Sequence, residues 1–107
     1  MRRAFENEMV DYLRRAFREQ CETMDDVALR QIIRDGIVRA ARHSFESDGQ
    51  VRRWLAMMFT FGRDFDSDPD CSWAREVLRY GDSSTENKME RLFKEARRWE
   101  HRGRGLN

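Results

Sequence analysis

Proline and cysteine are both scarce in this sequence, and each shortage narrows the range of folds. Pro69 is the only proline among 107 residues, so long stretches are free to form helices. The two cysteines, Cys21 and Cys71, belong to no CxxC motif and to no Cys/His cluster. Isolated cysteines in a chain without an export signal are typical of free thiols, and we expect no disulfide.

Long hydrophobic runs are also missing. No apolar run approaches the roughly 20 residues that cross a bilayer, and residues 1–6 contain no apolar signal-peptide core. We therefore expect a cytoplasmic protein without membrane contact. The 21 basic and 20 acidic side chains leave a net charge of +1. This balance argues against a histone-like nucleic-acid binder, because such proteins depend on uncompensated positive charge.

The sequence offers few residues for catalysis. It contains no Gly-rich phosphate loop, no nucleophile elbow and no zinc ligand set. Its two histidines, His43 and His101, lie at a predicted helix end and in the C-terminal tail. We therefore predict a protein that is not an enzyme, with no catalytic residues, no cofactor and no small-molecule substrate.

A repeated amphipathic pattern runs through most of the chain. Apolar residues recur every three or four positions, which is the period of a helix with one buried face. In the first such stretch Phe5 and Leu13 lie on the apolar face, and the opposite face, which includes Glu6, is expected to be solvated. The pattern predicts an all-α fold, a compact bundle of about five helices in one domain over 1–101, with a flexible tail at 102–107. The predicted helices span residues 2–20, 25–43, 48–61, 72–80 and 85–101.

Capping signals support several of these boundaries. Ser or Thr followed three residues later by an acid or amide is typical of a helix start, and glycine commonly follows a helix end. Gly36, inside the second helix, costs about 1 kcal/mol relative to alanine, and we expect it to admit a neighbouring helix. The expected caps are Thr23 with Asp26, Ser47 with Gln50, Ser83 with Glu86, and Asp70 or Ser72 for the short helix, with Gly62 and Gly81 as helix ends.

The third predicted helix is apolar on nearly every side. Residues 54–61 carry almost no polar side chain, and a strand is the alternative for this run. We favour a helix because the i, i+3, i+4 and i+7 positions are filled and a cap precedes the run. Such a helix must be buried on most sides, either at the centre of the core or partly against a partner.

An acidic loop follows this helix. Asp64, Asp66, Asp68 and Asp70 alternate with other residues, which resembles the start of a calcium loop. The pattern then fails, because a proline stands where the sharp-turn glycine belongs and an arginine where the bidentate glutamate belongs. We therefore expect no metal site, with calcium binding as the less favoured alternative. Aspartates in such a loop are expected to cap helices and to meet arginines instead.

The last predicted helix is basic. Residues 88–104 contain seven basic and three acidic side chains, a charge that would attract the acidic loop. A small regulatory protein that binds nucleic acid through this helix is the alternative function. Acidic side chains within the helix weigh against that alternative, because they pair with the basic ones. The residues that would contact nucleic acid are Arg91, Lys94, Arg97 and Arg98.

Several stretches of the chain form a recognisable combination. They are IRDGIVRAA at 33–41, WLAMMFTFGRDFD at 54–66, DP at 68–69 and WAREVL at 73–78, with MRRAFE at 1–6 and MERL at 89–92. Over about residues 1–96 the chain resembles small bacterial proteins encoded beside VgrG or PAAR spike components and effectors of type VI secretion systems. In that group a proline precedes the Trp-Ala pair, where this chain has Ser72. The resemblance implies an accessory protein that acts on an effector or spike protein as adaptor, chaperone or inhibitor, and it implies no catalytic residue.

The sequence therefore favours a non-catalytic protein-interaction module. Seven phenylalanines and three tryptophans are many for one small domain, and an exposed aromatic patch would mark a protein interface. Phe65, between aspartates, is expected to fold back into the core or to contact the partner. The alternative is that these side chains only lock the third and fourth helices together. The candidate partner-binding residues are Trp54, Phe61, Arg63, Asp64, Phe65, Asp66 and Trp73.

Overall fold

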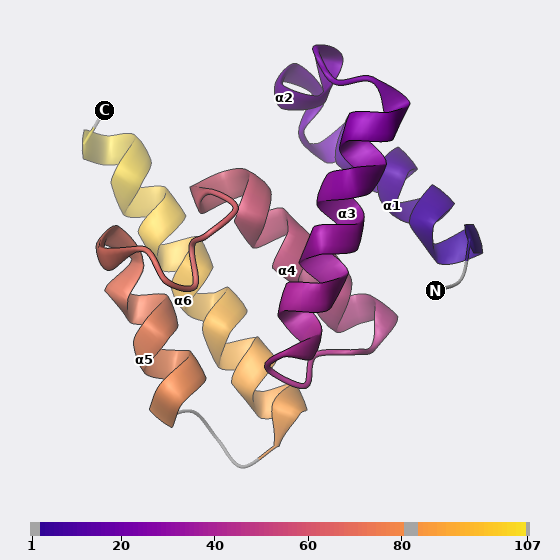
Figure 1. The fold of residues 1–107 in the computed structure, drawn as a ribbon. Coiled ribbons are helices and arrows are strands. Elements are labelled where there is room, and N and C mark those ends of the chain that lie inside the picture. The colour runs from indigo at the N-terminus through magenta and orange to yellow at the C-terminus, as the bar shows by residue number, and fades with distance from the viewer. Residues whose placement is uncertain (1–2, 81–83, 107) are drawn as a thin grey trace.

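A computed structural model of the chain describes residues 3–80 and 84–106 (Figure 1). Within these ranges every regular element is helical, which confirms the predicted all-α bundle. The elements are α1 (Arg3–Ala16), α2 (Arg18–Glu22), α3 (Asp26–Ala41), α4 (Asp48–Phe61), the 3-10 turn η1 (Pro69–Cys71), α5 (Ser72–Tyr80) and α6 (Thr85–Leu106). No helix in the described ranges is long and apolar enough to cross a membrane.

The predicted boundaries hold best for the middle of the chain. Helices α4 and α5 coincide with the predicted segments 48–61 and 72–80, and the apolar run in α4 is helical rather than extended. Helix α6 continues to Leu106, so most of the stretch expected to be a flexible tail is helical. The predicted helix end at Gly81 lies outside the described residues.

The first predicted helix is divided at Phe17. The backbone of Phe17 leaves the helical region, with φ −127° and ψ 54°. Its ring packs against Phe59 of α4, with 5.3 Å between the ring centroids. Gln20 in α2 donates a side-chain hydrogen bond of 2.9 Å to the carbonyl oxygen of Phe59. These two contacts hold the redirected chain against the end of α4.

Helix α4 is the centre of the bundle. It packs against α1, α3 and α6, while α5 packs on the outer side of α6 and runs in the opposite direction (Figure 1). Because α4 has neighbours on several sides, half of its 14 residues are buried, including the apolar run 54–59. Its fully buried side chains include Trp54, Leu55 and Met57.

Gly36 lets α3 and α4 approach each other closely. A Cβ atom added to Gly36 would lie 2.5 Å from Leu55 Cδ2 and 3.0 Å from Met58 Sδ, closer than van der Waals contact allows. Both of those side chains are buried in α4. The glycine expected to admit a neighbouring helix therefore does so, and the neighbour is α4.

The predicted helix cap is confirmed at the start of α4 and is wrong at the start of α3. At α4, Ser47 and Gln50 form the full capping box. At α3 the cap is Asp25, whose Oδ1 accepts from the Ala28 N–H at 2.8 Å, in place of the predicted Thr23. At α6 Ser84 Oγ accepts from the backbone N–H of Asn87, whereas the predicted Ser83 lies outside the described residues. Asp68 caps η1, the turn that precedes α5. That Asp70 or Ser72 caps α5 itself stays a prediction.

Helix α3 ends in a left-handed turn that places Phe45 in the core. Ser44 has φ 66°, and the N–H groups of Ser44 and Phe45 donate to the carbonyls of Ala41 and Ala40. This is the Schellman arrangement, which is usually completed by glycine. The turn buries Phe45 completely and leaves His43 pointing toward the loop that follows α4.

The polar face of α1 is not fully solvated, contrary to the prediction for Glu6. Glu6 is only 5% exposed and lies between α1 and α3. Arg30 donates to its Oε1 at 2.9 Å, and Arg34 donates to both of its oxygens. A buried carboxylate is stable only with such partners, so the sequence periodicity that placed Glu6 in solvent missed a specific link between two helices.

Candidate functional site

A glycine and two backbone hydrogen bonds give the loop after α4 a defined shape. Gly62 ends α4 with φ 118°, a conformation that only glycine adopts without strain. The N–H of Phe65 donates to the Gly62 carbonyl, and the N–H of Ser67 donates to the Asp64 carbonyl. These bonds fold residues 62–67 into two consecutive turns, so that successive side chains point in different directions.

Phe65 anchors this loop in the core. It has no exposed surface, and its ring centroid lies 4.8 Å from that of Trp54 and 6.4 Å from that of Trp73. Phe61 meets Trp73 edge-on, with 5.0 Å between the ring centroids. The four predicted aromatic residues thus form one continuous chain of rings that joins α4, the loop and α5. Such offset and edge-on pairs each add about 0.5–1.5 kcal/mol to the burial of their area.

Two acidic side chains of the loop, Asp64 and Asp66, are directed toward α3. Arg39 Nη1 lies 2.6 Å from Asp64 Oδ1 and 3.8 Å from Asp66 Oδ1, and it also donates to the carbonyl oxygen of Arg63. Among the described residues no ion pair joins these aspartates to α6. The expected attraction between the acidic loop and the basic last helix is therefore replaced by a link to α3.

His43 completes this polar cluster, and sequence reasoning missed it. Its Nε2 lies 3.7 Å from Asp66 Oδ2, and its ring lies 5.3 Å from that of Trp54. The position of His43 depends on the turn at Ser44, which no apolar period reveals. The sequence carried one indication, because a polar residue directly after a predicted helix can reach the neighbouring loop.

Three of the seven predicted partner-binding residues are buried and the others reach the surface to different degrees. Trp54 and Phe65 have no exposed area, and Trp73 is 6% exposed, so these rings act as internal anchors. The side chains of Arg63 and Asp64 are 56% and 69% exposed. Phe61 and Asp66 are half-buried.

The exposed loop residues continue onto an exposed part of α3. Arg63 Nη2 lies 3.7 Å from Asp35 Oδ2, and Asp35 also accepts a hydrogen bond from Arg39. One turn after Asp35, Val38 is 54% exposed, although valine is usually buried. We call Val38, Arg63 and Asp64 the loop surface. It combines one exposed apolar side chain with two exposed charged side chains that contact residues of α3.

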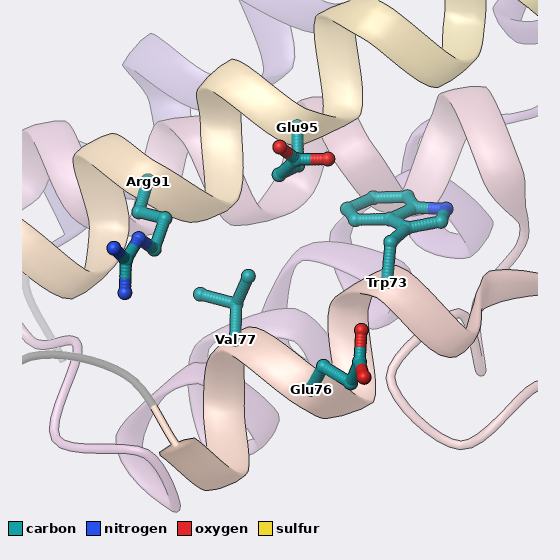
Figure 2. Close-up of a pocket in the computed structure, with 5 residues that line it drawn as sticks. All are labelled: Trp73, Glu76, Val77, Arg91 and Glu95. Carbon is teal, nitrogen blue, oxygen red and sulfur yellow. The ribbon is translucent and has the colours of Figure 1, made fainter.

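Several surface hollows border the aromatic chain. Trp73 lines one of about 350 Å³ between α5 and α6, where Glu76 and Val77 face Arg91 and Glu95 (Figure 2). A second hollow, of about 240 Å³, lies between the loop and α5. Its lining residues are His43, Asp66, Arg75, Leu78 and Arg79.

The cysteines are poorly placed for nucleophilic chemistry. Cys21 and Cys71 are free and buried, as expected for thiols without a disulfide. Burial raises the pKa of both thiols, and at Cys71 the nearby Asp68 and Asp70 raise it further. Both therefore stay protonated at neutral pH, whereas the thiolate is the reactive form. Within residues 3–80 and 84–106, no three His, Cys, Asp or Glu side chains gather as a metal site requires.

The basic residues proposed for nucleic-acid contact are all exposed on α6. Arg98 donates to Glu95 at 3.0 Å, one turn earlier on the same helix. Arg91 lies at the edge of the hollow between α5 and α6, and Arg97 at the edge of another beside α4. The helix therefore presents basic side chains interrupted by a paired acid, Glu95, whereas the pairing expected from the sequence was that of Glu90 with Arg91 or Lys94.

Comparison with protein-family models, with curated proteins and with solved structures found no match to this chain.

Proposed function

We propose that this protein is a non-catalytic interaction module that binds another protein through the loop surface, Val38, Arg63 and Asp64. The observation that carries the proposal is the contrast in burial between neighbouring residues of the loop. Phe65 is buried between Trp54 and Trp73, while the two residues before it stand in solvent.

Rigid support makes an exposed surface efficient at binding. Association costs free energy when side chains and loops must be ordered, about 0.5–1.5 kcal/mol for each flexible side chain. Here Arg39 already holds Asp64 and the carbonyl of Arg63, and the guanidinium of Arg63 lies 3.7 Å from Asp35. Partner binding therefore requires little further ordering of the loop.

The mixed chemistry of the loop surface suits a protein partner. Val38 offers an exposed apolar side chain, and Arg63 and Asp64 offer one charge of each sign. Opposite charges at fixed positions set the register of a protein interface more than its affinity.

The partner class in this proposal comes from the sequence resemblance described above. It is a spike protein of the VgrG or PAAR kind, or an effector, of a type VI secretion system. The module would act in the cytoplasm as adaptor, chaperone or inhibitor of that partner.

Co-expression with each spike and effector protein encoded beside this chain tests the proposal. We expect one of them to co-purify as a stoichiometric complex that survives size-exclusion chromatography. Measuring the effector's solubility and toxicity with and without the module then separates a chaperone from an inhibitor. A module that elutes as a free monomer in every combination would contradict the proposed function.

A further inference from the structure

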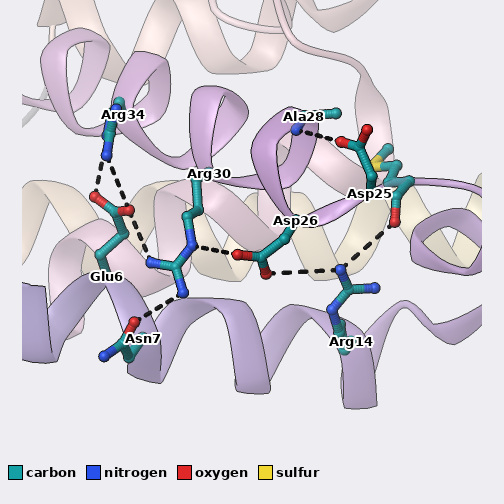
Figure 3. Close-up of polar contacts among 9 residues, drawn as sticks. Glu6, Asn7, Arg14, Asp25, Asp26, Ala28, Arg30 and Arg34 are labelled. Carbon is teal, nitrogen blue, oxygen red and sulfur yellow. Dashed lines mark hydrogen bonds and ion pairs between the residues drawn. The ribbon is translucent and has the colours of Figure 1, made fainter.

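A second face of the molecule, between α1 and α3, gathers three arginines around one buried carboxylate. Arg3 and Asn7 lie one turn apart on α1, and Arg30 and Arg34 lie one turn apart on α3. Together with Glu6 they line a hollow of about 350 Å³. Figure 3 shows Glu6 between the two guanidinium groups of α3, with Asn7 beside Arg30.

The acceptors around this hollow are already engaged. Glu6 Oε1 accepts from Arg30 Nη1 and Arg34 Nη2, and Oε2 accepts from Arg34 Nε at 3.1 Å. Asn7 Oδ1 accepts from Arg30 Nη2 at 2.8 Å. Asp26, which does not line the hollow, accepts from Arg30 Nε at 2.7 Å.

The donors around the hollow are in excess. Because Asn7 turns its oxygen toward Arg30, its amide NH₂ group faces elsewhere (Figure 3). Arg34 Nη1 and the guanidinium of Arg3 donate to no partner among the described residues. Three guanidinium groups and one carboxylate therefore line the hollow, and the unused hydrogen-bonding capacity consists mainly of N–H groups.

We propose that this hollow binds a phosphate group. Guanidinium N–H groups around a positively charged hollow match an oxyanion, and charge-assisted bonds of this type are the stronger hydrogen bonds in proteins. Donors arriving from two helices suit the several oxygens of a tetrahedral anion better than the two oxygens of a planar carboxylate.

Glu6 gives the hollow its geometry. Its carboxylate fixes Arg34 by two hydrogen bonds, and Arg30 is fixed by three different acceptors. Arginines held in this way lose little side-chain entropy when an anion binds. The buried carboxylate that weakens the positive field of the hollow thus also orders its donors.

Titration with inorganic phosphate at constant ionic strength tests this site. The readout is NMR of the arginine Nε–H signals and of the asparagine side-chain signals. We expect saturable shifts at Arg34 and Asn7, and weaker shifts with acetate. Asn7→Asp keeps an oxygen for Arg30 but places a negative charge in the hollow, so it should weaken phosphate binding by about tenfold or more.

Asn87→Asp is the matched control, because it makes the same substitution at an exposed position on α6. It should bind phosphate like the wild type, and both variants should melt like folded protein. The proposal is overturned by shifts that do not saturate, by equal binding of acetate, or by an Asn7→Asp variant that binds phosphate as tightly as the Asn87→Asp variant.

Discussion

Arg39 on α3 holds Asp64 of the loop after α4, with 2.6 Å between Nη1 and Oδ1. The same nitrogen donates to the carbonyl oxygen of Arg63, and the Nε of Arg39 donates to Asp35. One guanidinium group therefore connects the outer part of the loop to α3, while Phe65 connects its inner part to the core. The loop is therefore attached to the fold on both sides, by Arg39 and by Phe65.

The ion pairs of Glu6 with Arg30 and Arg34 make the free energy of unfolding depend on pH. Hydrogen bonds from Arg34 and Arg30 hold the pKa of Glu6 below its ordinary value of 4.5, against burial, which raises it. A carboxylate with a lowered pKa stabilises the folded state above its unfolded-state pKa, and this contribution is lost as the pH falls through the folded-state pKa. Glu6→Gln should therefore lower the free energy of unfolding at pH 7 by about 1–3 kcal/mol.

Urea unfolding of wild type and Glu6→Gln between pH 7 and pH 3 measures this effect. The difference between the two proteins should shrink as the pH falls below the ordinary value of 4.5. Glu8→Gln, at an exposed position on the same helix, should leave stability unchanged at every pH. A difference that stays constant across this range would show that Glu6 does not act through its charge.

Substitution by alanine should lower thermal stability at Gly36 and leave it equal or higher at Gly49. A Cβ at Gly36 would overlap Leu55, whereas a Cβ at Gly49 meets nothing within 4 Å. Overpacking a core costs about 1–3 kcal/mol, while replacing glycine by alanine in a helix gains up to about 1 kcal/mol. Thermal melts should therefore show a lower Tm for Gly36→Ala and an equal or higher Tm for Gly49→Ala. Equal shifts in both variants would mean that α3 and α4 are not in close contact.

Ser44 offers a stabilising substitution. Its φ of 66° is unfavourable for any residue with a Cβ, so Ser44→Gly should raise the free energy of unfolding by about 0.5–1 kcal/mol. Chemical denaturation of this variant beside Ser44→Ala, which keeps the Cβ, isolates the backbone effect. If glycine and alanine at this position give the same stability, the left-handed turn at the end of α3 is not present in solution.

The sequence predicted the helices well because helical periodicity is a local property. The run at 54–61 was recognisable as a largely buried helix from its apolar character. Phe65 was expected either in the core or against a partner, and it lies in the core. The capping box at Ser47 was also predictable, since its partner Gln50 is three residues away.

The polar contacts were harder to predict because they join residues far apart in the chain. The link between Glu6 and Arg34 spans 28 residues, and the pairing of Asp64 with Arg39 spans α4. Periodicity assigned both acids to solvent or to the basic C-terminal helix, since it contains no information on which helices become neighbours. The caps at Asp25 and Ser84 differ from the prediction by only a residue or two, because several polar residues compete for each helix start.

The affinity of the co-purified spike or effector protein for charge-reversed variants tests the central claim most directly. Calorimetric titrations would compare wild type with Asp64→Arg and with Glu90→Arg, a matched reversal at an exposed position on α6. Thermal melts would confirm that both variants are folded. Binding through the loop surface predicts that Asp64→Arg weakens the complex by about tenfold or more, while Glu90→Arg binds like the wild type. Equal affinities for the two folded variants would contradict it.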